Sequence, residues 1–148
     1  MSLKEQILAD MKNAMREKDA SRLESIRLLR AAIQRKEVDD QVELSDEDVL
    51  AIVQKQIKQS QDAIRQFNDG DRADLADKEQ VHVDNLQEYL PEQMSDDEIA
   101  AAVNAAISST GAESMRDMGK VMGLLKGQLQ GKADMGKVSG LIKAQLNS

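Results

Sequence analysis

The sequence predicts an all-α protein, in which an N-terminal module of four helices is followed by a C-terminal bundle of three. Apolar residues recur at helical spacing in seven successive segments. Aromatic residues make up only 1% of the chain, so its core must come from Leu, Ile, Val, Met and Ala, which favours helices over a β-sheet. Capping sequences such as Ser95-Asp96-Asp97-Glu98 mark helix starts.

The first two segments predict a helical hairpin over residues 3–16 and 20–37. Leu3, Ile7 and Met11 mark the apolar side of the first helix, and Asp19 is placed to cap the second. Because so few residues join them, we expect the two helices to run antiparallel.

The third and fourth helices are predicted from about residue 46 to 67 and from about 72 to 90. Ser45 opens the third helix, Asn68-Asp69-Gly70 ends it, and Asp71 is expected to cap the fourth. His82 lies on the apolar side of the fourth helix, where a partly buried structural role is the better interpretation than catalysis. Pro91, the only proline, marks a boundary between an N-terminal domain of residues 1–92 and a C-terminal domain of residues 93–148.

The C-terminal domain contains a sequence repeat. After a helix that ends at Thr110-Gly111, the decapeptide 117–126 (DMGKVMGLLK) recurs at 134–143 (DMGKVSGLIK), with eight identical positions. Each copy predicts an amphipathic helix, the second capped by Asp134.

Glycines occupy the opposite face of these helices, at Gly119, Gly123, Gly127 and Gly131 and again at Gly136 and Gly140. A glycine inside a helix costs roughly 1 kcal/mol relative to alanine, so a row of glycines suggests that something approaches the backbone closely. Lysines and an arginine lie within or beside the row, and exposed backbone next to positive charges suits the binding of a polyanion. The alternative is that the glycines let two helices of this protein pack closely and that the lysines are ordinary solvated charges.

Charge is distributed unevenly along the chain. The net charge of −7 divides into +4 for residues 1–36, −14 for residues 37–111 and +3 for residues 112–148, which leaves two basic ends available to nucleic acid. With no cysteine and one histidine, the chain offers neither disulfides nor a structural zinc site, and we expect no metal and no cofactor. No apolar stretch approaches a membrane span, so we expect no membrane partner and a cytoplasmic protein.

Several motifs resemble the YqeY-like family: Lys55-Gln56-Ile57-Lys58-Gln59, residues 67–75 (FNDGDRADL), Lys78-Glu79, Tyr89-Leu90-Pro91 and residues 117–122 (DMGKVM). The likeness spans essentially the whole chain. In that family the C-terminal part is similar to the tail of the B subunit of the tRNA-dependent amidotransferase. The resemblance implies two helical modules and a tail that contacts tRNA. It also brings with it the family label of a carbon-nitrogen ligase with glutamine as amido donor.

These observations lead to three functional hypotheses. The first is a non-catalytic accessory protein that binds tRNA or another structured RNA, and the second is an adaptor for a protein partner or an amidotransferase-type complex. The third, amide transfer from glutamine, is implied only by the resemblance, because no nucleophile with an adjacent base is evident and we expect no catalytic residue. The candidate RNA- or partner-binding residues are Arg116, Gly119, Lys120, Gly123, Lys126, Lys132, Lys137 and Lys143.

Overall fold

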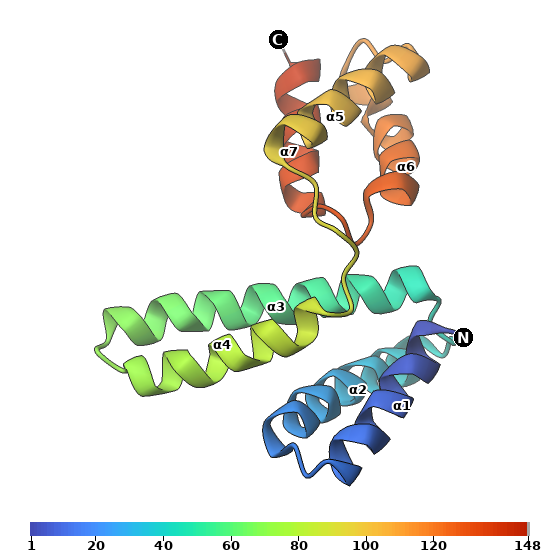
Figure 1. Cartoon of the computed structure of the whole chain (residues 1–148). Coiled ribbons are helices and arrows are strands. Elements are labelled where there is room, and N and C mark those ends of the chain that lie inside the picture. Colours follow the sequence, from blue (N-terminus) through green and yellow to red (C-terminus); the bar gives the residue numbers. More distant parts are fainter. Residues whose placement is uncertain (148) are drawn as a thin grey trace. The chain divides into compact units, whose positions relative to one another are not determined.

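The computed structural model describes residues 1–147, and over these residues the protein is helical and contains no strand (Figure 1). The all-α prediction is therefore confirmed. The α-helices are α1 (Leu3–Arg16), α2 (Ala20–Asp40), α3 (Asp46–Asp69), α4 (Ala73–Gln87), α5 (Asp96–Thr110), α6 (Met118–Leu129) and α7 (Met135–Leu146), and a short 3-10 helix, η1 (Met115–Asp117), precedes α6.

The chain divides into two compact units, one of residues Met1–Leu90 and one that begins at Pro91. The first unit holds α1 to α4, and the second holds α5, η1, α6 and α7. The division falls two residues before the boundary expected at residues 92 and 93. That the chain forms two domains with this boundary stays a prediction.

Helices α3 and α4 of the first unit lie side by side as a long hairpin, and α2 packs against α1, α3 and α4 (Figure 1). Helix α3 starts where its sequence predicts, because Ser45 and Asp48 form a capping box with backbone and side-chain hydrogen bonds in both directions. The core of the unit consists of buried residues from all of these helices, the loop between α2 and α3, and the turn after α4: Ile7, Ala14, Ile26, Leu29, Ile33, Leu44, Val49, Val53, Ile57, Val83, Leu86 and Tyr89.

Helix α3 ends at Asp69 as predicted, but the end of α2 and the start of α4 differ from the predictions, and each lies beside a left-handed residue that is not glycine. Helix α2 continues past residue 37 to Asp40, and its C-cap Gln41 has a φ of 54°, in the left-handed region. Before α4 the left-handed residue is Asp71, with φ of 57°, and not Gly70, with φ of −91°. Arg72 is the N-cap of α4 and makes no side-chain capping hydrogen bond, so the prediction that Asp71 caps this helix is wrong.

Helices α5, α6 and α7 of the second unit pack pairwise against one another. Ser95 and Glu98 form the predicted capping box at the start of α5, and the Asp134 carboxylate accepts a hydrogen bond of 2.9 Å from the Gly136 N–H at the start of α7. The core of this unit is separate from the first, and consists of Ile99, Val103, Ala106, Val121, Leu125, Leu129, Ala133, Val138, Ile142 and Leu146.

The loop between α6 and α7 is tied to the segment that precedes α5. The side-chain amide of Gln93 donates to the Gly131 carbonyl at 2.7 Å, and the Met94 N–H donates to the Lys132 carbonyl at 2.9 Å. Gly131 is buried and has φ of 85°, a conformation that favours glycine, so this glycine serves the turn and not an exposed helix face.

Candidate functional site

The two repeat helices bury one face and expose the other. In α6 the residues Val121, Leu125 and Leu129 are buried in the core of the second unit, and in α7 Val138, Ile142 and Leu146 occupy the equivalent positions. The spacing of four residues keeps each set on one side of its helix. The opposite side of each helix therefore faces solvent.

The helical glycines of the repeat lie on this exposed side. A Cβ atom added at Gly119, Gly123, Gly127 or Gly140 would meet no neighbouring atom within 4 Å in the described chain. Close packing between two helices of this protein would have filled that space. The alternative that these four glycines serve such packing is therefore wrong for residues 1–147.

The cations that the sequence singled out fall into three groups. Arg116 on η1 and Lys120 and Lys126 on α6 are exposed and share a continuous stretch of chain with Gly119 and Gly123. Lys137 and Lys143 are exposed on α7, but the Lys137 ammonium forms an ion pair with the Asp96 carboxylate at the start of α5. Lys132 lies apart from both groups, in the loop between the two helices.

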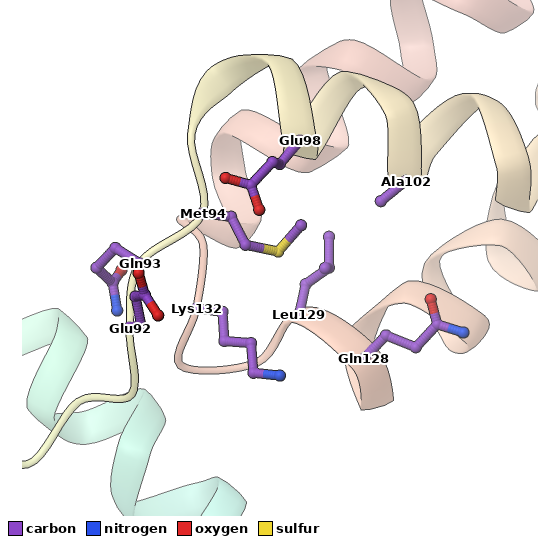
Figure 2. A pocket seen from close by; sticks show the side chains of 8 residues that line it. All are labelled: Glu92, Gln93, Met94, Glu98, Ala102, Gln128, Leu129 and Lys132. Carbon is purple, nitrogen blue, oxygen red and sulfur yellow. The ribbon is translucent and has the colours of Figure 1, made fainter.

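Lys132 lines a pocket of about 480 Å³ between the start of α5 and the end of α6 (Figure 2). The side chains of Met94 and Leu129 lie between Glu98 and Lys132 in this view, so the pocket has an apolar centre with charges of both signs at its edge. The remaining lining residues are Glu92, Gln93, Ala102 and Gln128. The repeat pattern did not predict this pocket, because its walls come from two separate stretches of the chain, residues 92–102 and 128–132.

The start of α6 is fixed by a short turn. Ser114 caps η1, and the Asp117 carboxylate accepts hydrogen bonds from the backbone N–H groups of Glu113 and Ser114, at 3.0 and 3.4 Å. These two hydrogen bonds, in that order of importance, hold the pKa of Asp117 below its usual value. Asp117 is thus engaged with the backbone, one turn before Lys120.

A polar cluster in the first unit was not predicted. The Ser25 hydroxyl lies 2.6 Å from Nδ1 of His82 and accepts a hydrogen bond of 3.0 Å from the Asn85 amide. A serine beside an imidazole is half of a nucleophilic pair. Ser25 is only 1% exposed and also donates to the Ser21 carbonyl, so a substrate carbonyl cannot reach it. The cluster satisfies buried polar groups, in agreement with the structural interpretation of His82.

Residues 1–147 contain no group of three or more His, Cys, Asp or Glu side chains arranged to hold a metal ion. None of the helices within this range is long and apolar enough to cross a membrane.

Comparison with known proteins gives matches along most of the chain. A family model described as Yqey-like protein matches residues 4–146. A Pyrenophora tritici-repentis protein named altered inheritance of mitochondria protein 41, mitochondrial, is 35% identical over 127 residues, which cover 84% of this chain and 70% of that protein. The Lachancea thermotolerans protein of the same name is 37% identical over 82 residues, covering 55% of this chain and 44% of that protein. An uncharacterized Schizosaccharomyces pombe protein is 43% identical over 51 residues, covering 34% of this chain and 42% of that protein.

These relatives contradict the expectation of a cytoplasmic protein, because two of them are named as mitochondrial. The expectation rested on composition and on the absence of an apolar stretch. Neither property distinguishes these compartments, since the signals that direct a protein to an organelle are separate from its folded part.

Proposed function

Because the chain belongs to the YqeY-like family, we propose that it is a non-catalytic accessory protein that binds tRNA or another structured RNA through the exposed face of α6. One observation carries this proposal. Three glycines of α6 leave bare backbone at the surface, and Lys120 and Lys126 are exposed on the same helix. The family resemblance of the C-terminal part to the tail of an amidotransferase B subunit, which contacts tRNA, supports the choice of ligand.

The glycines of α6 weaken the helix that carries them. Each costs roughly 1 kcal/mol relative to alanine in a helix interior, and no contact within the described chain offsets this cost at Gly119, Gly123 or Gly127. A ligand that approaches the helix backbone closely supplies a physical reason for them. A phosphate backbone fits, because lysines beside the bare helix offer point charges that neutralise phosphates.

The second unit is poorly equipped to read bases. The only aromatic residues of the chain, Phe67 and Tyr89, both belong to the first unit, so the second unit has no ring on which a base can stack. Recognition through phosphates and the shape of a folded RNA is the mode that remains.

A protein adaptor is the second candidate, and the pocket favours it. Its apolar centre at Met94 and Leu129 suits a side chain from a partner, and Leu124 is an exposed apolar residue of α6. The carbon-nitrogen ligase activity implied by the family label has no corresponding geometry among residues 1–147, where the Ser25–His82 pair is inaccessible.

Titration of labelled tRNA at about 50 mM and about 200 mM salt tests the RNA proposal. We expect affinity to fall steeply with salt, since each neutralised phosphate contributes about −0.7 to −0.9 to the slope of log K against log salt. Lys120→Gln should weaken binding by about fivefold and reduce the slope by about one phosphate contact. Lys55→Gln, at an exposed lysine of α3 in the acidic middle of the chain, is the matched control and should leave both unchanged.

Absence of binding at the lower salt concentration would rule out the RNA proposal. The adaptor hypothesis gains instead if Gly123→Leu abolishes the binding of a protein partner while Lys120→Glu does not.

A further inference from the structure

The two repeats are nearly identical in sequence, yet their first lysines have different surroundings. Lys137 of α7 is paired with Asp96, 41 residues earlier in the chain. Lys120, which occupies the same position in the first copy, is exposed and forms no ion pair with any residue in the described part of the chain.

The difference arises from how α5 begins. Its first turn carries Asp96, Asp97 and Glu98, and α5 packs against both repeat helices. Glu98 is engaged in the capping box with Ser95, and Asp96 is the carboxylate of this turn that pairs with Lys137. At the start of α6 the Asp117 carboxylate binds backbone N–H groups, so it attracts Lys120 without forming an ion pair with it.

We propose that Asp96 makes α6, rather than α7, the principal phosphate-binding helix, because it neutralises Lys137 and leaves Lys120 free. This inference rests on the RNA-binding function proposed above. It assigns the two copies of one motif different tasks, since both contribute to the core but only the first offers its leading lysine to a ligand.

The expected effect is modest, because an ion pair between exposed side chains is weak and a phosphate can compete for the lysine. Replacing Asp96 should therefore increase RNA affinity by about two- to fivefold. It should also add about one phosphate contact to the salt dependence, since Lys137 becomes available.

Labelled tRNA, titrated at the same two salt concentrations, tests this with five variants. We expect Lys120→Gln to weaken binding, Lys137→Gln to change it by less than about twofold, and Asp96→Asn to strengthen it. The double variant Asp96→Asn/Lys137→Gln should lose that gain. Asp97→Asn removes the same charge from the same turn without releasing Lys137, and we expect it to leave the salt slope unchanged.

The outcomes separate the two proposals. If the wild-type protein fails to bind tRNA even at low salt, the proposed function is wrong and the inference with it. If the wild type binds but Lys137→Gln weakens binding as much as Lys120→Gln, the inference alone is overturned. A gain for Asp97→Asn equal to that for Asp96→Asn also overturns it, because charge alone then explains the change.

Discussion

Tyr89 connects the turn after α4 to α1 through its hydroxyl group, which donates a hydrogen bond of 2.7 Å to Oδ2 of Asp10. The other carboxylate oxygen of Asp10 lies 3.8 Å from the guanidinium of Arg22 on α2. Burial, and then the hydrogen bond to Asp10, raise the pKa of Tyr89 well above its usual value. The three residues thus join three elements of the first unit through a charge-assisted contact.

This raised pKa predicts a loss of stability at high pH. The folded state keeps Tyr89 protonated, so its contribution is fully present below the unfolded value near pH 10 and is lost as the pH rises above it. The free energy of unfolding should fall by up to about 1.4 kcal/mol per pH unit above pH 10 through this group. Tyr89→Phe should make that fall shallower in urea unfolding between pH 8 and about 11.5. Equal slopes for both proteins would contradict the assignment.

Three connections between helices contain a left-handed residue that is not glycine. Lys18, Gln41 and Asp71 adopt left-handed conformations although none is glycine. A non-glycine residue pays a steric penalty there, so residue type favours Gly70 as the left-handed residue between α3 and α4, yet the structure has Asp71 in that conformation. The conformational preference of a residue type therefore predicts poorly which residue of a tight connection between two packed helices is left-handed.

At the scale of elements, α6 combines a well-packed inner face with an outer face that its own unit does not use. Gly123→Ala should raise the free energy of unfolding by about 1 kcal/mol, because alanine is the better helix former and its Cβ meets open space. Hydrogen exchange of the α6 amides, compared between the wild type and Gly123→Ala, measures this gain in stability directly.

The matched control for Gly123 is Gly131→Ala. Gly131 is buried with φ of 85°, so alanine there should destabilise the turn between α6 and α7. If the α6 amides of Gly123→Ala exchanged faster than those of the wild type, by as much as in Gly131→Ala, the added methyl group would be meeting other atoms. The outer face of α6 would then be covered, which would contradict the prediction.

At the scale of the whole molecule, two separate cores predict two separable unfolding events. Leu125 is fully buried in the second core, and Tyr89 belongs to the first, where it is the only tyrosine of the chain. Leu125→Ala should destabilise the second unit by about 2–5 kcal/mol. Tyrosine fluorescence should then report an unchanged transition, whereas hydrogen exchange in α7 should accelerate. A parallel shift of the tyrosine signal would instead indicate that both units unfold together.

The sequence by itself determined the helices and most of their caps. Helical periodicity and capping boxes act over three or four residues, so Ser95 with Glu98 and the buried series from Val121 to Leu129 can be recognised without a fold. The structure places Arg116 on η1, Lys132 in the loop between α6 and α7, and the other six candidate residues on α6 and α7, and all eight are exposed.

Only the tertiary structure decided which partners these residues have. Ser25 and His82 are 57 residues apart, and Asp96 and Lys137 are 41 apart, so no local pattern relates them. The pocket at Lys132 likewise requires two separate stretches of the chain to meet. Contacts of this kind depend on how the helices pack, and the packing is decided jointly by apolar residues that are distant in sequence. Two copies of one motif can therefore be alike in sequence while the lysine of one copy is paired and the lysine of the other is not.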